Sequence, residues 1–438
     1  MTSAGDPVNT AADGTNEDYF ASYEDVEIHR LMVSDAPRTQ AYATAISKNK
    51  HLFEGKVVMD VGAGTGILSM FIAAAGARRV HAVEASGMAA IIQQVAEDNG
   101  FGDVVQVHHA RVEDITLPGD EKVDVIVSEW MGFYLLHESM LNSVIWARDH
   151  FLSEDGTVFP SEARIYACPC SLQTLYKEQI NFWDEVYGFN MTAVKNYALK
   201  SKMIKPEVCL IKETDLLAEP SCVKRFNLRW VIEEEVKHFA ETTFVGVTRP
   251  GTYQGLCLWF ECDFDGREYD EEGQEVGAVV TLSTSPTSPA THWKQTVVVL
   301  GYGASHMPQQ VALLCQENLN ASTDSDNSAS PTANKDKTKV PTASPPKPLK
   351  NGSGKAETCD NTIQPNFDNW VEKDEVVGWK LVFAQSEENA RHYTMTVEML
   401  DPEVVEHPLP CACPMPRCVI IAKMMEQDDD GNDIIDCT

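Results

Sequence analysis

The hydrophobic positions in the first third of the chain form short apolar runs separated by segments with helical periodicity. Four runs rich in β-branched residues indicate buried parallel strands, and a short fifth follows; they lie at 57–61, 80–84, 104–107, 123–127 and 156–159. The segment between the first two runs is rich in helix formers. Strands that alternate with helices predict an α/β domain with a parallel sheet, which we assign to residues 18–155.

The hydrophobic pattern changes after this domain. Short segments in which apolar and polar residues alternate indicate antiparallel strands, and they recur at 163–167, 256–264, 279–282, 370–383 and 392–400. They predict an antiparallel β domain, either a barrel or a sandwich, over residues 156–400.

A stripe of apolar residues at helical spacing interrupts the β pattern at 172–187. Its members are Leu172, Leu175, Tyr176, Ile180, Trp183 and Tyr187. The stripe belongs either to an arm that docks on another subunit or to a helix that packs on its own β domain. The pattern alone leaves both interpretations open.

Three stretches lack both patterns. Residues 1–17 and 318–357 are dominated by small and polar residues with almost no large apolar side chain, which predicts disorder. Residues 401–438 form an acidic tail with four cysteines, three of which lie close together at Cys411, Cys413 and Cys418. We identify no fourth cysteine or histidine ligand beside this triplet, so we expect free thiols and no metal site.

Charge and composition narrow the range of partners. The 438 residues include 66 acidic and 35 basic side chains, which gives a net charge of −31. Such a chain should repel nucleic acid and attract basic peptides, although acidity also serves solubility. No apolar run reaches the roughly 18 to 20 residues that span a membrane. Twelve cysteines without disulfide-framework spacing fit a reducing compartment.

A glycine turn connects the first predicted strand to the first helix. The sequence Gly62-Ala-Gly64-Thr-Gly66 has the spacing G-x-G-x-G, whereas the dinucleotide fingerprint is G-x-G-x-x-G. Asp60, at the end of the preceding strand, would oppose a phosphate but suits a ligand with an ammonium group. This turn favours S-adenosylmethionine over NAD.

Acidic residues after the next two strands fit the same cofactor. Glu84 ends the second strand, where a carboxylate can accept hydrogen bonds from two adjacent ribose hydroxyls. After the third strand, the backbone amide of Val112 and the side chain of Glu113 are placed to meet an adenine edge.

Two carboxylates follow the fourth strand. Glu129 leaves its carboxyl end, where open α/β sheets build their sites, and Glu138 comes nine residues later, beyond Gly132. Together they could hold one planar cation. Alternatively, Glu138 merely caps the helix that follows, as acids in a first turn commonly do.

Taken together, these motifs resemble those of the protein arginine N-methyltransferases. The resemblance rests on Val-Met-Asp-Val-Gly-Ala-Gly-Thr-Gly, Ser-Glu-Trp-Met-Gly…His-Glu-Ser-Met-Leu and Thr-His-Trp-Lys-Gln, and it covers roughly residues 18–315 and 365–400. Leu135-Leu-His-Glu138 looks closest to the nuclear sixth member. The resemblance implies a Rossmann-like S-adenosylmethionine-dependent methyltransferase domain followed by an antiparallel β-barrel domain, and a homodimer held by a helical dimerisation arm, here 172–205.

The resemblance also assigns roles to single residues. Glu129 and Glu138 match the pair that grips arginine, His292 matches the barrel histidine that pairs with Asp35, and Met32 matches the methionine associated with asymmetric dimethylation. The residues matching cofactor contacts are His29, Arg38, Gly62, Gly64, Glu84, Val112 and Glu113. Among these, Arg38 would pair with the carboxylate of the methionine moiety.

The implied function is that of a type I enzyme, which forms mono- and asymmetric dimethylarginine from S-adenosylmethionine. Expected substrates are histone tails or Gly/Arg-rich proteins, with a role in transcription regulation in the nucleus, the cytoplasm or both. We expect no membrane and no direct nucleic-acid partner. The alternative is a catalytically weak, methyltransferase-like scaffold or coregulator, and the departures from the family pattern (Ala63, the insertion and the tail) leave the matched site intact.

Overall fold

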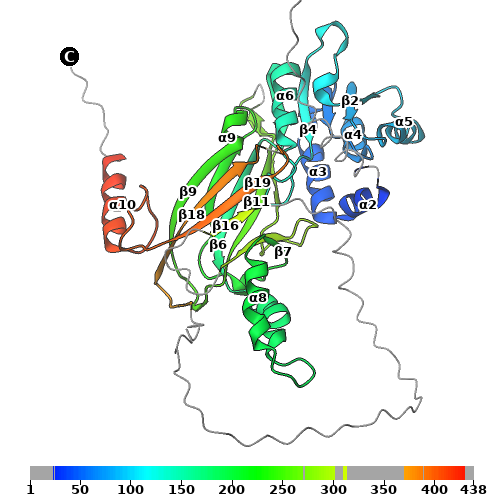
Figure 1. Ribbon diagram of the computed structural model, residues 1–438. Helices are drawn as coiled ribbons and strands as arrows, with labels where there is room; N and C mark the ends of the chain where they lie inside the picture. The colour runs from blue at the N-terminus through cyan, green and yellow to red at the C-terminus, as the bar shows by residue number, and fades with distance from the viewer. Residues whose placement is uncertain are drawn as a thin grey trace, which may run out of the picture. The chain divides into compact units, whose positions relative to one another are not determined.

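The computed structural model describes residues 23, 25–269, 272–300, 309–312, 369–387 and 389–429, with the backbone alone at 309–312 and 426–429. All of these residues belong to one compact unit (Figure 1). The segments 1–17 and 318–357, for which we predicted disorder, lie outside the described residues.

A five-stranded parallel sheet forms the first part of the fold. Its strands are β1 (Val57–Val61), β2 (Arg79–Glu84), β3 (Val105–His109), β4 (Val123–Ser128) and β5 (Leu152–Phe159). They lie in the order β3-β2-β1-β4-β5, and every pair is parallel. The strand order reverses between β1 and β4, so the carboxyl ends of these two strands form the topological switch point where such sheets bind ligands. The predicted Rossmann-like α/β architecture is confirmed.

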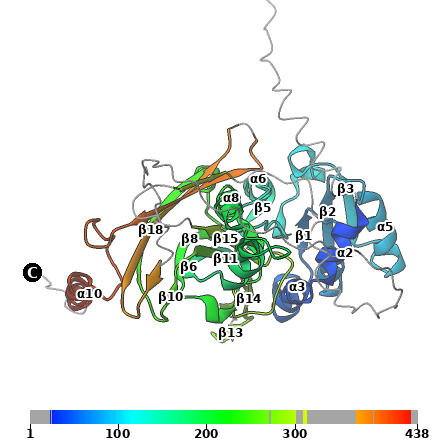
Figure 2. The same ribbon diagram turned by 60° about the horizontal axis from the view of Figure 1, so that its bottom comes forward.

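Helices pack on this sheet and precede it. The connections contain α4 (Ile67–Ala74), α5 (Ala89–Asp98) and α6 (Leu141–Phe151). Two helices come before β1, α2 (Val26–Ser34) and α3 (Ala36–Lys48). Helix α3 contacts α4 and also strand β14 (Val279–Ser283) of the β domain, which lies beside α3 in Figure 2. Asp35 separates α2 from α3, because its side chain accepts a hydrogen bond from the backbone N–H of Arg38 and caps α3.

Two antiparallel sheets form the rest of the fold. The first contains β6 (Glu162–Cys170), β7 (Glu207–Cys209), β8 (Ser221–Asn227), β11 (Gly255–Asp265), β14 (Val279–Ser283) and β15 (Gln295–Val299). The second contains β9 (His238–Gly246), β16 (Gln309–Ala312), β18 (Val376–Gln385) and β19 (Tyr393–Leu400), in the order β16-β19-β18-β9. Two short pairs, β10 (Gly251–Thr252) with β17 (Trp370–Val371) and β12 (Glu268–Tyr269) with β13 (Glu275–Val276), complete it. An antiparallel β-rich domain therefore follows the methyltransferase-like domain, as predicted.

The apolar stripe at 172–187 divides into a buried and an exposed part. Its segment forms α7 (Gln173–Leu175), a π-helical turn (Tyr176–Ile180) and a 3-10 turn (Asn181–Asp184), followed by α8 (Thr192–Lys202). The four buried members, Leu172, Leu175, Tyr176 and Ile180, pack in one hydrophobic cluster with residues of β11 and β15. They cover their own β domain, so they are not a free docking stripe. Trp183 is half-buried, and Tyr187 is 98% exposed.

Part of the acidic tail is folded. After β19, residues 401–415 lead into α10 (Pro416–Asp429) (Figure 1). Cys411, Cys413 and Cys418 are buried in a small hydrophobic cluster with Phe244 of β9. Among the described helices, none has the length and apolarity needed to cross a membrane.

Candidate active site

Glu129 lies at the switch point, directly after β4, and is paired with an arginine from α3. Arg38 Nε donates to Glu129 Oε2 over 3.0 Å, and Arg38 Nη2 makes a second, shorter contact with the same oxygen. The two side chains are only 7% and 9% exposed. The other oxygen, Glu129 Oε1, is buried and has no hydrogen-bond partner among the described residues. A buried carboxylate oxygen without a partner is an acceptor available for a ligand.

The environment keeps the arginine of this pair charged. Burial by itself lowers the pKa of Arg38, but the negative charge and hydrogen bond of Glu129 outweigh it and raise the pKa above the ordinary arginine value. A permanent cation therefore stands beside Glu129 in the free protein.

The loop after Glu129 folds back sharply on itself. Gly132 and Leu135 exchange two backbone hydrogen bonds of 3.0 Å, and a Cβ at Gly132 would lie 2.2 Å from the carbonyl oxygen of His137. Leu135, at φ 78°, and Glu138, at φ 74°, adopt left-handed conformations. Non-glycine residues in this region cost energy and persist where the surrounding structure holds them, often at functional sites.

Two distant parts of the chain hold Glu138. Tyr23 Oη donates to Glu138 Oε2 over 2.6 Å. The backbone N–H of Glu138 donates to the carbonyl of Arg391, and Arg391 Nη1 donates back to the carbonyl of Glu138, both over 3.0 Å. Helix α6 begins at Leu141 without a side-chain cap, so the interpretation of Glu138 as a helix cap is wrong.

His292 and Asp35 are in direct contact. His292 Nδ1 lies 2.6 Å from Asp35 Oδ2, and the backbone N–H of His292 donates to the same oxygen over 2.8 Å. Burial favours the neutral acid, but the hydrogen bonds from His292 and Arg38 hold the pKa of Asp35 below its ordinary value. The neighbouring Trp293 donates its Nε1 proton to the carbonyl of Met131 over 3.0 Å. This hydrogen bond ties the loop of His292 to the loop from Glu129 to Glu138, which we call the glutamate loop.

Glu84 and the glycine turn are joined through backbone groups. Glu84 Oε2 accepts from the N–H of Gly64, and Oε1 accepts from the N–H of Ser86, each over 2.7 Å. A Cβ at Gly64 would lie 3.4 Å from the imidazole of His29, so the backbone approaches His29 closely. Gly62 has φ 74°, which an L side chain rarely adopts. The carboxylate orientation is thus fixed, and each oxygen keeps a lone pair for a ligand.

Asp60 is a second acid with an unused oxygen at the end of β1. It is fully buried; Ser69 Oγ donates to Oδ2 over 2.6 Å, whereas Oδ1 has no partner among the described residues. Burial raises its pKa to about 7. The buried acceptor and the adjacent glycine turn fit the ammonium end of S-adenosylmethionine.

The remaining predicted residues lie around this edge of the sheet. Val112 begins a 3-10 turn after β3, and Glu113 accepts hydrogen bonds from Ser143 Oγ over 2.6 Å and from Arg111 Nε over 3.3 Å. The carbonyl of Met32 accepts from Arg38 Nη1 over 3.1 Å. Their roles toward cofactor or product stay predictions.

Two residues of this arrangement were missing from the sequence-based site. Tyr23 had a weak signal, because it belongs to the aromatic segment that precedes α2. Arg391 had no signal, since it meets Glu138 from a position 253 residues away in the chain.

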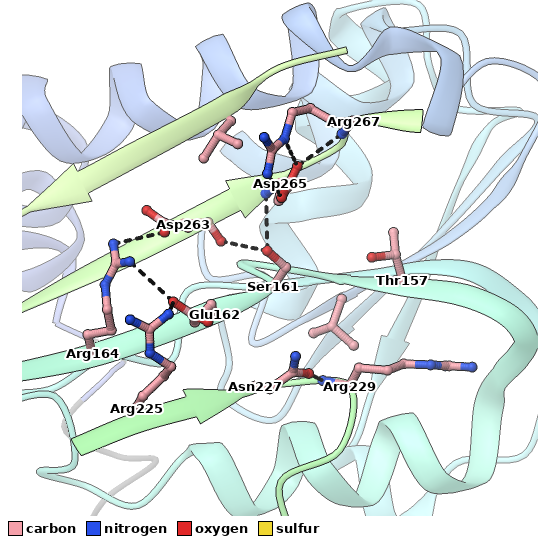
Figure 3. Close-up of a pocket in the computed structure, with 12 residues that line it drawn as sticks. Thr157, Ser161, Glu162, Arg164, Arg225, Asn227, Arg229, Asp263, Asp265 and Arg267 are labelled. Atoms are coloured by element: carbon pink, nitrogen blue, oxygen red, sulfur yellow. Dashed lines mark hydrogen bonds and ion pairs between the residues drawn. The ribbon is translucent and has the colours of Figure 1, made fainter. Parts of the chain in front are cut away.

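A separate cavity of about 440 Å³ contains none of the predicted site residues (Figure 3). Its charges are largely paired within its wall: Arg164 contacts Glu162 and Asp263, and Arg267 contacts Asp265. This internal pairing makes the cavity a poor alternative to the glutamate site.

Comparisons with known proteins agree with the resemblance to arginine methyltransferases that the sequence motifs indicate. Residues 58–156 match the family described as methyltransferase domain, and residues 161–330 match the arginine methyltransferase oligomerization subdomain. Human protein arginine N-methyltransferase 2 is 40% identical over 297 residues, which cover 67% of this chain and 66% of the human protein. A rice relative, probable protein arginine N-methyltransferase 6.1, is 40% identical over 64% of this chain and 75% of its own length.

Solved structures agree with these relatives. The Trypanosoma brucei PRMT1 enzyme–prozyme complex with AdoHcy has a TM-score of 0.63 at 28% identity, covering 88% of this chain and 98% of that one. A structure of PRMT6 with SAH has a TM-score of 0.58 at 26% identity, covering 86% and 100%. Relatives named 1, 2 and 6 all match, so the comparisons do not assign the chain to the sixth member. The chain belongs to the S-adenosylmethionine-dependent protein arginine N-methyltransferases.

Proposed function

We propose that this protein is a type I enzyme that forms mono- and asymmetric dimethylarginine, on histone tails or Gly/Arg-rich proteins in the nucleus or cytoplasm. The observation that carries the proposal is the glutamate loop. It presents two carboxylates, and one of them keeps a buried oxygen without a partner among the described residues. The net charge of −31 favours basic substrates.

Arginine is a poor nucleophile, which explains the need for two carboxylates. Its guanidinium stays protonated, with a pKa of about 12.5 to 13.8, and its lone pairs are delocalised. Bound S-adenosylmethionine supplies an electrophilic methyl group on a sulfonium. Glu129 and Glu138 hold the guanidinium by charge-assisted hydrogen bonds, fix one terminal nitrogen and draw positive charge onto the others.

The neighbouring residues position this pair. Arg38 fixes one oxygen of Glu129, and the other oxygen of Glu129 is available for the substrate. Tyr23 holds Glu138 in place from the other side of the loop. His292 holds Asp35, which caps the helix that carries Arg38. Gly62, Gly64, Glu84 and Asp60 would hold the cofactor.

Methylation of defined peptides tests the proposal. A Gly/Arg-rich peptide incubated with the full chain and radiolabelled S-adenosylmethionine should take up label, whereas the same peptide with lysine in place of arginine should not. Acid hydrolysis and amino-acid analysis should then find asymmetric dimethylarginine. Only symmetric product would contradict the type I assignment, and no label on any arginine peptide would favour the scaffold alternative.

We also propose a homodimer that docks through the exposed aromatics of the arm, Phe182, Tyr187, Phe189 and Tyr197. The match to an oligomerization subdomain supports this assembly. Truncating an aromatic anchor commonly costs about 2 kcal/mol or more, so Tyr187→Ala should weaken self-association roughly 30-fold. Tyr269→Ala, a similarly exposed tyrosine on β12, is the matched control. Unchanged sedimentation of Tyr187→Ala would remove this residue from the interface.

A further inference from the structure

Four side chains in the C-terminal segment direct their metal-binding atoms at one point. They are His407, Cys411, Cys413 and Cys418, and their ligand atoms all lie within 4.8 Å of one another. His407 Nδ1 is 3.5, 3.3 and 3.2 Å from the sulfurs of Cys411, Cys413 and Cys418, respectively. All four residues are buried.

The three nitrogen-to-sulfur separations are close to those of a tetrahedral thiolate–imidazole site. Zinc bound at about 2.3 Å to sulfur and about 2.0 to 2.1 Å to nitrogen places a nitrogen and a sulfur ligand roughly 3.6 Å apart. The separations measured from His407 Nδ1 come within a few tenths of an ångström of that value. Our prediction of free thiols rested on the lack of a fourth ligand, and that premise is wrong, because His407 lies four residues before Cys411.

The imidazole is held in the orientation a metal ligand needs. His407 Nε2 donates to the carbonyl of Pro402 over 3.0 Å, so this nitrogen carries the proton and Nδ1 turns its lone pair toward the sulfurs. The ring also stacks on Phe244 of β9, with centroids 3.6 Å apart and planes 10° apart. Metal-binding histidines commonly donate their second ring N–H to a backbone carbonyl in this way.

The backbone also holds one of the three cysteines in place. Cys418 lies in the first turn of α10, and its N–H donates to the carbonyl of Met415 over 2.9 Å. The positive end of a helix dipole favours a thiolate at this place. None of the three cysteines forms a disulfide. A single disulfide would leave one sulfur and the imidazole without a role, whereas one metal ion uses all four groups.

The cluster is also the main core of the segment that it anchors. Its buried members are the three cysteines and Phe244, with only a few partly buried apolar neighbours, Val376, Leu400, Val405 and Met415. Pro414 packs closely on β9, since a Cβ at Gly246 would lie 2.7 Å from its Cδ. So small an apolar core gives little stability without a metal or another cross-link.

We propose that His407, Cys411, Cys413 and Cys418 bind one structural Zn²⁺ ion that cross-links residues 407–418 and so stabilises the segment that packs on strand β9 through Phe244 and Pro414. Three thiolates and one imidazole form a soft ligand set that suits zinc. Four protein ligands close the coordination sphere and leave no position for substrate, so the ion has a structural role. The site is independent of methyl transfer.

Metal analysis of the full chain tests the proposal. Protein purified without chelator from zinc-supplemented cells should contain about one zinc per chain by mass spectrometry of the metal. Cys413→Ser and Cys418→Ser should each lose most of it. Cys222→Ser, which changes an exposed cysteine outside the cluster, should retain it. Wild-type protein that stays metal-free after incubation with zinc under reducing conditions would overturn the site.

A second measurement covers variants that fail to fold. Wild-type protein stripped by a chelator and reloaded with Co²⁺ should show thiolate charge-transfer bands and the intense visible bands of tetrahedral cobalt. Chelation should also increase proteolytic cleavage within 401–415, and zinc should reverse this. Octahedral cobalt spectra, or cleavage that is indifferent to zinc, would refute the proposal. Because neither readout depends on methyl transfer, failure here is distinguishable from failure of the proposed activity.

Discussion

The glutamate loop and the histidine–cysteine cluster each place cation-binding groups within one short segment, but they differ in whether an acceptor atom remains without a partner. In the cluster, all four ligand atoms face one another, and no acceptor is left over. In the loop, Arg38 and Tyr23 each occupy one carboxylate oxygen, while Glu129 Oε1 keeps no partner among the described residues. The closed arrangement suits a permanent ion, and the open arrangement suits a cation that must enter and leave.

Ligand chemistry matches this difference. Thiolates and imidazole bind a soft metal ion tightly enough to stabilise a fold. Carboxylates hold a guanidinium by charge-assisted hydrogen bonds, which can be exchanged for hydrogen bonds to water when the substrate leaves. The comparison therefore predicts that the two sites can be disabled separately.

Removing a carboxylate from the loop should have the largest effect. Glu129→Gln or Glu138→Gln should lower turnover about 10²- to 10³-fold, equivalent to about 3 to 4 kcal/mol, because the near-isosteric amide removes the negative charge that the guanidinium meets. Cofactor affinity and zinc content should stay unchanged, and Glu97→Gln on the exposed face of α5 is the control. Steady-state kinetics measures the effect. Near-normal turnover in either variant would exclude the paired-carboxylate mechanism.

Glu84→Ala should weaken the cofactor rather than the chemical step. A hydrogen bond to a charged group contributes about 1.5 to 3 kcal/mol, so loss of the carboxylate should lower S-adenosylmethionine affinity at least roughly 10- to 100-fold. The variant also frees the N–H groups of Gly64 and Ser86. Calorimetry should show the loss in the binding constant. An unchanged binding constant would mean that Glu84 only holds the backbone of Gly64 and Ser86 and does not bind the cofactor.

Cofactor affinity should also depend on pH through Asp60. Its pKa of about 7 means that the buried carboxyl is largely protonated at pH 6 and ionised at pH 8. Only the ionised form pairs with an ammonium group, so affinity should rise up to about tenfold between these values and then level off. Asp60→Asn should flatten this rise in a titration series. A wild-type affinity that falls with pH would contradict the assigned contact.

A change in the histidine–cysteine cluster should have the smallest effect on turnover. Cys413→Ser should keep turnover within about twofold of wild type below its melting temperature while losing zinc. The reason is that its cluster packs separately from the core that contains the glutamate loop. Its thermal midpoint should fall, because a ligand bound only to the folded state stabilises that state. Loss of turnover in a folded Cys413→Ser variant would mean that the two sites are coupled.

Local patterns made much of the fold predictable. Hydrophobic periodicity predicted the parallel strands. The glycine turn and the acids at strand ends could be predicted because they lie directly next to those strands in the sequence. The prediction for the tail was wrong about the ligands, because it considered the cysteine triplet without His407. Periodicity also left the arm undecided, because helical spacing is the same whether Ile180 covers its own domain or a partner.

By itself, the sequence determined which elements form and which acidic residues lie at the switch point of the sheet. The reason is that strand direction fixes where the carboxyl ends of β1 and β4 lie. Only the tertiary structure decided what each acid meets. Tyr23 contacts Glu138 across 115 residues of sequence, His292 contacts Asp35 across 257, and Phe244 of β9 stacks on His407. Such contacts depend on how whole elements pack, and no spacing in a single sequence encodes them.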